Sequence, residues 1–150
     1  MVQLKNIMKI EEGNKLIAEF MGCKISKDRA TCRGVKYTFP YNKNESKHLT
    51  HLAYNSSWDW LMPVVEKIEV LDDSKNHYSW FESEQTERSN FAGYSVLIEC
   101  NMCTIDLNFE LDPSECIFHT RAETKIEAVW QTVIRFIQRR NENSSSIQSQ

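Results

Sequence analysis

A chain of 150 residues, with 26% charged and 41% hydrophobic residues, has the length and composition of about one globular domain. Its formal net charge of −3 provides no general attraction to nucleic acids or anionic membranes, so neither is predicted as a partner. The net charge does not exclude a local basic pocket. No stretch approaches the ~18 apolar residues of a membrane-spanning helix, and the N-terminal residues show no signal-peptide pattern. Five cysteines without a secretory signal favour reduced thiols. We therefore predict a cytoplasmic protein, in the reducing cytosol.

The first third of the chain predicts one helix and one strand. Apolar side chains follow one face of residues 14–21, where Asn14 is placed to cap the start and Gly22 to end the helix. In chain order, the predicted elements are a helix over 14–21, a loop or frayed hairpin over 23–33, a strand over 35–39 that ends at Pro40, and a loop over 42–50 whose end forms a helical turn.

The segment from Tyr54 to Ile68 predicts the central helix. One face is formed by apolar residues at helical spacing: Trp58, Leu61, Val65 and Ile68. Ser56 or Ser57 can cap its start. Pro63 requires that the helix begin near Asp59 or Trp60, or that it be kinked at the proline. In both cases irregular backbone around residues 56–60 leaves N–H groups free to face a ligand.

The second half predicts strands followed by a long helix. Two alternating runs around Asn101-Met102 predict an antiparallel hairpin, with Asn101 taking the positive φ of the turn. Thr124 and Glu127 form a capping box before an amphipathic helix. The remaining predicted elements are a strand over 77–82, a charged loop over 84–90, an extended piece over 117–119 and a disordered polar tail over 141–150.

Together these elements predict an α+β fold. We expect an antiparallel sheet of about four or five strands, with three helices packed mainly on one face, in a single domain over residues 1–140.

The cysteines and histidines do not predict a metal site or a catalytic centre. Cys100-x-x-Cys103 is half of a zinc knuckle, but no second pair has the usual spacing. The residues considered for its completion are Cys23, Cys32, Cys116 and His119. We interpret Cys100 and Cys103 as small buried side chains on the inward face of the hairpin. The histidines have no metal-binding spacing, and the chain contains no glycine-rich phosphate loop and no hydrolase motif.

Two groups of residues are candidates for ligand binding. Trp58-Asp59-Trp60 can build a pocket in which an indole stacks on a planar base and a carboxylate accepts from a hydroxyl; the alternative is two core tryptophans beside a capping aspartate. His119-x-Arg121 can hold a phosphate, or the two residues are ordinary loop residues before a helix.

Three phrases of the sequence resemble a group of small proteins common in bacteriophage and prophage genomes. They are NKLIAEFMG at 14–22, YNSSWDWLMPVVEKI at 54–68 and KIEAVW at 125–130. The chain departs from the group at Asn55, where the group usually has histidine, so no imidazole role is implied there. The resemblance implies a viral accessory protein made in a bacterial cytosol and assigns no activity.

Small phage accessory proteins often antagonise host defence, which by analogy suggests a function. We expect a non-enzymatic, cofactor-free anti-defence protein that sequesters a cyclic or ADP-ribose-type nucleotide. Its expected ligand-binding residues are Tyr54, Ser56, Ser57, Trp58, Asp59 and Trp60, with Arg33, His119, Arg121 and Arg135 meeting phosphates. The alternatives are an inhibitor of a host defence protein or a structural homo-oligomer. A third is a metal-dependent nucleotide hydrolase that uses Asp59 and the scattered histidines.

Overall fold

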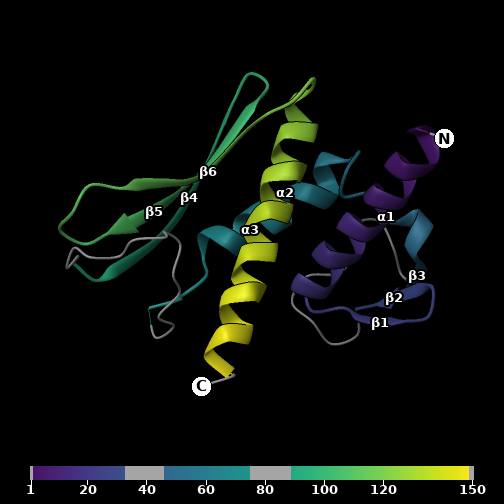
Figure 1. The fold of residues 1–150 in the computed structure, drawn as a ribbon, viewed down its shortest axis with the longest axis horizontal. Helices are drawn as coiled ribbons and strands as arrows, with labels where there is room; N and C mark the ends of the chain where they lie inside the picture. Colours follow the sequence, from purple (N-terminus) through teal and green to yellow (C-terminus); the bar gives the residue numbers. More distant parts are fainter. Residues whose placement is uncertain (1, 33–45, 75–88, 149–150) are drawn as a thin grey trace. The chain divides into compact units, whose positions relative to one another are not determined.

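The computed structural model describes residues 2–32, 46–74 and 89–148 (Figure 1). Its fold is α+β, as predicted, with three α-helices and two three-stranded antiparallel sheets in the described residues. The expectation of one sheet of four or five strands is wrong in this respect. The chain forms two compact units, Met1–Val64 and Val65–Gln150. The single domain expected over residues 1–140 stays a prediction. The predicted strands over 35–39 and 77–82 lie outside the described residues.

The first unit combines a long helix with a small sheet of order β1-β2-β3 (Figure 1). Its elements are α1 (Val2–Phe20), β1 (Lys24–Ser26), β2 (Arg29–Thr31), β3 (Ser46–His48), the 3-10 turn η1 (Leu49–His51) and the beginning of α2 (Trp58–Glu69). The frayed hairpin expected over 23–33 is therefore β1 and β2. The segment expected as a loop over 42–50 contains the strand β3, which was not predicted, and the expected helical turn, η1.

The C-terminal end of α1 is closed by a Schellman motif, as Gly22 predicts. The N–H of Gly22 donates to the carbonyl of Glu19 at 3.0 Å, and the N–H of Cys23 donates to that of Ala18 at 3.0 Å. Gly22 has φ 97°, which costs a glycine little. The expected start at Asn14 is wrong, because α1 begins at Val2 and Asn14 lies inside it.

Asn14 is a buried polar side chain rather than a helix cap. It is 2% exposed. Its Nδ2 donates to the carbonyl oxygen of Leu52 at 3.0 Å and to Oδ1 of Asn55 at 2.9 Å. These bonds join α1 to the segment that leads into α2, because Leu52 and Asn55 lie between η1 and that helix.

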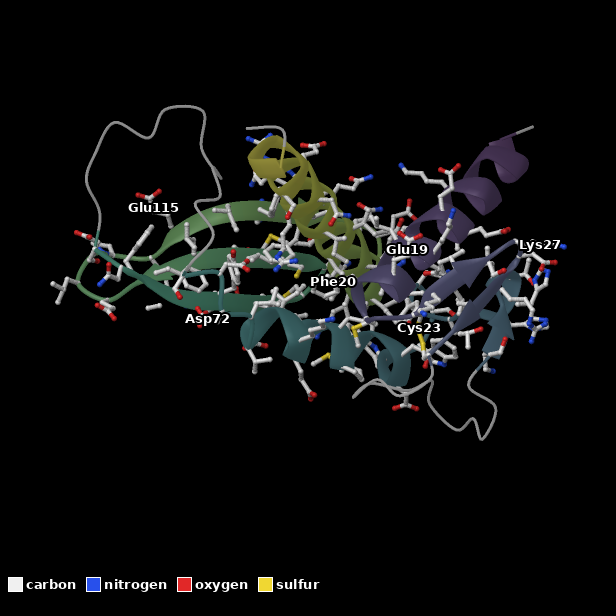
Figure 2. The ribbon with its side chains drawn as sticks, turned by 90° about the horizontal axis from the view of Figure 1, so that it is seen from below. Glu19, Phe20, Cys23, Lys27, Asp72 and Glu115 are labelled. Carbon is white, nitrogen blue, oxygen red and sulfur yellow. A yellow bond between two sulfur atoms is a disulfide. The ribbon has the colours of Figure 1, made fainter. Side chains whose placement is uncertain are left out.

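A disulfide between Cys23 and Cys32 closes the β1–β2 hairpin (Figure 2). Lys24 pairs with Thr31, so the two cysteines are the next residues across the ladder, and their Cα atoms lie 4.3 Å apart. Both side chains are buried. The sequence-based expectation of reduced thiols is therefore wrong for this pair, because hairpin pairing brings together residues that are nine positions apart.

The second unit is built on a sheet of order β4-β5-β6 (Figure 1). Its elements are β4 (Phe91–Glu99), β5 (Met102–Phe109), β6 (Glu115–Arg121) and α3 (Lys125–Gln148), together with the end of α2. The predicted hairpin is present, but its turn lies one residue earlier than predicted. Ile98 pairs with Cys103, so the turn is Cys100-Asn101, and Cys100 rather than Asn101 has the positive φ, of 49°.

Helix α3 packs against the β4-β5-β6 sheet. Its start is confirmed, because the N–H of Glu127 donates to Oγ1 of Thr124 at 3.2 Å. The helix continues to Gln148, so the segment expected as a disordered tail from residue 141 is helical up to that residue. Within the described residues, no helix is both long and apolar enough to cross a membrane.

A buried ion pair links α3 to the segment after α2 in the same unit. The carboxylate of Asp73, 4% exposed, accepts from Nε and Nη2 of Arg140 at 3.1 and 2.9 Å and from the hydroxyl of Tyr94 at 2.7 Å. Burial, followed by the charge of Arg140, lowers the pKa of the nearby Lys67 ammonium. The guanidinium of Arg140 thus neutralises the buried carboxylate of Asp73 and donates two hydrogen bonds to it.

Candidate functional site

The candidate site is the start of α2 and the residues just before it. The carbonyl of Ser57 accepts from the N–H of Leu61 at 3.0 Å and from that of Trp60 at 3.2 Å, which makes Ser57 the cap residue. The helix begins at Trp58, directly after Ser57, one of the two predicted cap residues, and Pro63 lies inside it. Because proline cannot donate to the carbonyl of Asp59, it costs about 3 kcal/mol in a regular helix interior.

Two of the predicted aromatic residues form core rather than surface. Tyr54 and Trp60 are 4% and 8% exposed, and their rings meet edge to face with centroids 5.1 Å apart. Burial raises the pKa of the Tyr54 phenol. Nζ of Lys47, from β3, lies 5.5 Å from the centroid of the Trp60 ring, so this core pair brings a cation close to the start of α2.

The surface of the site is formed by Ser56, Trp58 and Asp59. Ser56 and Asp59 are exposed. Trp58, in the first turn of α2, is 37% exposed. This arrangement places an accessible indole face, a hydroxyl and a carboxylate within four consecutive residues. Chemically, such a surface can stack on a planar group and accept hydrogen bonds from hydroxyl or amino groups.

The predicted basic residues belong to other parts of the chain than the start of α2. Arg33 lies outside the described residues, whereas His119, Arg121 and Arg135 belong to the second unit. Nη1 of Arg135 donates to the carbonyl of His119 and to Oγ1 of Thr120, both at 3.0 Å. Its guanidinium therefore holds α3 to β6 within that unit.

On β6 itself, His119 and Arg121 lie on one face of the strand, opposite Thr104 and Met102 of β5. Both side chains are exposed. Nη2 of Arg121 lies 3.2 Å from Sδ of Met102, a weak acceptor. Both residues are therefore exposed on one face of β6, and their role in holding a phosphate stays a prediction.

The cysteines are arranged differently from a zinc knuckle. Cys100 is exposed in the hairpin turn and Cys103 is buried, so the expectation that both face inward holds only for Cys103. Burial raises the pKa of the Cys103 thiol to about 11, partly offset by a hydrogen bond with Thr132. Among the described residues, no three His, Cys, Asp or Glu side chains are grouped so that they could hold a metal ion.

These environments predict a clear order of thiol alkylation. At pH ~8 a thiol with a pKa of about 11 is thiolate in roughly one molecule in a thousand, so Cys103 should react at least ~10-fold more slowly than the exposed Cys100. Cys23 and Cys32 should react only after reduction. Peptide mass spectrometry after timed alkylation measures the labelling of each of these cysteines. Labelling of Cys23 and Cys32 without reductant would contradict the disulfide.

Comparison of the chain with protein-family models, curated proteins and solved structures gives no match in any of the three. No related protein therefore assigns a chemistry to the start of α2. The exposed indole, hydroxyl and carboxylate described above are the basis for interpreting it.

Proposed function

We propose that the protein is a non-enzymatic accessory protein that binds a small nucleotide-type ligand at the start of α2. The observation that carries this proposal is the exposed indole of Trp58 next to the carboxylate of Asp59 in the first helical turn. Buried tryptophans stabilise a core, but an indole that stays accessible beside polar groups is available to stack on a base.

Each part of a nucleotide has a matching group in this segment. The base stacks on Trp58, and Asp59 accepts hydrogen bonds from the ribose hydroxyls. The positive end of the helix dipole favours a phosphate, and Lys47 supplies a nearby cation. Asp59 repels a phosphate placed beside it, so the sugar is the group expected there.

The biological setting of this proposal comes from the resemblance to small phage and prophage proteins. A phage protein that sequesters a cyclic or ADP-ribose-type nucleotide would weaken a host defence system that signals through it. Sequestration requires affinity and abundance rather than turnover, which is consistent with a site of stacking and hydrogen-bonding groups.

Native mass spectrometry of the protein purified from bacterial cells tests the proposal directly. Spectra recorded before and after denaturation should differ by the mass of a nucleotide released on unfolding, and they give the oligomeric state as well. If the purified protein is free of ligand, titration with cyclic mononucleotides, cyclic dinucleotides and ADP-ribose follows. Failure of all of these to bind would overturn the nucleotide proposal.

Substitution of Trp58 should weaken nucleotide binding strongly. Stacking of a base on an aromatic side chain is worth about 1–3 kcal/mol, so Trp58→Ala should reduce affinity by roughly 5- to 150-fold in calorimetric titration. Asp59→Asn should weaken the binding of ribose-containing ligands more than the binding of the free base. Met62→Ala is the matched control, since Met62 is equally exposed, at 37%, one turn further along α2. Folded variants that retain full affinity would show that the ligand binds elsewhere.

A second candidate function is inhibition of a host protein or assembly of a homo-oligomer. It is favoured by Trp58 and Met62, which lie at i and i+4 on α2 and are both exposed large hydrophobic side chains. A protein interface would use both residues, whereas the nucleotide site uses only Trp58. Size-exclusion chromatography with mass detection, followed by pull-down with the Met62→Ala variant, separates the two candidates.

A further inference from the structure

The outward face of the β1-β2-β3 sheet gathers basic and hydroxyl side chains. Residues that pair directly across an antiparallel ladder lie on the same face. The strand register therefore defines this surface, here called the basic face, by Lys24, Ser26, Arg29, Thr31, Ser46 and His48. Lys27 lies at the tip of the same hairpin (Figure 2).

Side-chain contacts agree with this division of the sheet. On the inward face, Ala30 is fully buried and Lys47 lies over the ring of Trp60. On the basic face, Oγ of Ser46 accepts from Nε of Arg29 at 3.0 Å and from Oγ1 of Thr31 at 3.3 Å. The basic face is thus separate from the Trp58 surface used in the proposed function.

The cations of this face are available to a ligand. Lys24, Lys27 and Arg29 are exposed, and none of them forms an ion pair with a carboxylate among the described residues. Oδ2 of Asp28 is already engaged, at 3.0 Å from Nε2 of His48. The N–H of Thr50 donates to Nδ1 of His48, so Nε2 carries the proton that faces Asp28.

Arg29 is held in position before any ligand arrives. Its Nε and Nη2 donate to Oγ and to the carbonyl oxygen of Ser46, at 3.0 and 3.3 Å. These bonds use one side of the guanidinium and leave Nη1 directed away from them. An arginine fixed in this way loses less conformational entropy when it binds a phosphate.

The charge distribution along the chain identifies the class of partner. Residues 23–51 contain seven Lys or Arg and two Asp or Glu, although the chain as a whole has a net charge of −3. The net charge of the whole chain does not show this local excess of basic residues. For that reason nucleic acid was not expected as a partner. Basic groups interleaved with hydroxyls are the usual contacts to sugar-phosphate backbone.

The composition of the basic face also argues against other partners. In the described part of residues 23–51, no large hydrophobic side chain is exposed, whereas protein interfaces depend on such anchors. No exposed aromatic ring is available on the face to stack on a base. We propose that the basic face binds the backbone of a nucleic acid, without reading its sequence, through Lys24, Lys27 and Arg29.

Fluorescence anisotropy with a short labelled oligonucleotide, single-stranded and duplex, tests this proposal. Three phosphate contacts predict a slope of log K against log salt of about −2 to −3, so affinity should fall roughly 20- to 40-fold between ~50 and ~200 mM salt. In the Lys24→Gln/Lys27→Asn variant one contact remains, and the same change in salt should reduce affinity only about threefold. Asparagine tolerates the positive φ of 55° at position 27, so the hairpin should be retained.

Lys15→Gln is the matched control, because Lys15 is an exposed lysine of α1 in the same unit but outside the basic face. It should leave the affinity and the salt dependence unchanged. The proposal is overturned if neither oligonucleotide binds at low salt, if Lys15→Gln weakens binding as much as the double variant, or if the slope is unaltered in that variant. It also fails if polyglutamate of matched charge displaces the oligonucleotide as well as unlabelled DNA does.

Discussion

Replacement of Arg140 by methionine is expected to lower the free energy of unfolding by about 3–5 kcal/mol, a large part of the stability of a typical domain. The carboxylate of Asp73 is 3% exposed at its side chain and receives two hydrogen bonds from the guanidinium. Methionine has a similar length but no donor. The buried carboxylate would therefore lose its bidentate partner, and the hydroxyl of Tyr94 cannot neutralise its charge. Urea denaturation followed by circular dichroism measures the loss.

The neighbouring arginine provides a matched control. Arg139 forms an exposed i,i+3 pair with Glu142 at 3.6 Å, with side chains 39% and 68% exposed, so Arg139→Met should change stability by at most about 0.5 kcal/mol. Removing both members of the buried pair, in Asp73→Leu/Arg140→Met, should cost less than Arg140→Met alone, since no charge is left buried. Equal effects of Arg139→Met and Arg140→Met would contradict this account of the ion pair.

The elements that the sequence predicts correctly are those with local signals. Gly22 ends α1 through bonds to Ala18 and Glu19, all within six residues, and Thr124 caps α3 three residues before Glu127. Both patterns are readable because every partner is close in sequence. The β4-β5 hairpin was likewise located from its alternation.

The register of that hairpin shows where local preference stops being sufficient. Asn101 tolerates positive φ better than cysteine does, yet Cys100 takes that conformation. Both turns place Cys103, Ile105 and Leu107 on the same, buried side of β5, because moving the turn by one residue shifts the strand pairing by two. The burial pattern therefore does not distinguish the two turns, and the preference of a single turn residue does not decide between them.

The β1-β2-β3 sheet and the buried polar bonds were not predictable from the sequence for related reasons. Strands β1, β2 and β3 have three residues each, too few to show an alternation. The bond from Asn14 to Leu52 spans 38 positions, and the pair between Asp73 and Arg140 spans 67. Neither has a sequence signal, because such partners meet only when the helices and loops pack.

The burial of the tryptophans at the start of α2 was not predictable from periodicity alone. Helical periodicity placed Trp58 on the inward stripe with Leu61, but Trp58 is 37% exposed and Trp60 is buried. An apolar stripe accounts for one face of a helix, whereas α2 also buries Trp60 and Val64 beside that stripe. The basic face was missed because net charge was considered for the whole chain, although the distribution of charge over residues 23–51 was already readable.

Replacement of Asn14 by aspartate should destabilise the protein by about 2–4 kcal/mol at neutral pH. The two side chains have nearly the same shape, so packing is conserved, but a carboxylate at this buried position faces the carbonyl oxygen of Leu52 and Oδ1 of Asn55. Burial would raise the pKa of the new carboxyl above the unfolded value of about 3.9. The loss of unfolding free energy should therefore be small below pH ~4, where the new carboxyl is protonated in both the folded and the unfolded protein. It should grow as the pH rises toward the pKa of this carboxyl in the folded protein.

Asn55→Asp is the isosteric control for this prediction. It changes the other end of the same hydrogen bond, where a carboxylate can still accept from Nδ2 of Asn14, and the position is only half-buried. Its effect should be below about 1 kcal/mol, with stability that does not decrease toward neutral pH. Urea denaturation at pH ~4 and pH ~7 separates the two variants. Equal losses at both positions, or a loss for Asn14→Asp that is unchanged by pH, would mean that Asn14 stabilises the fold by its shape rather than as a buried donor.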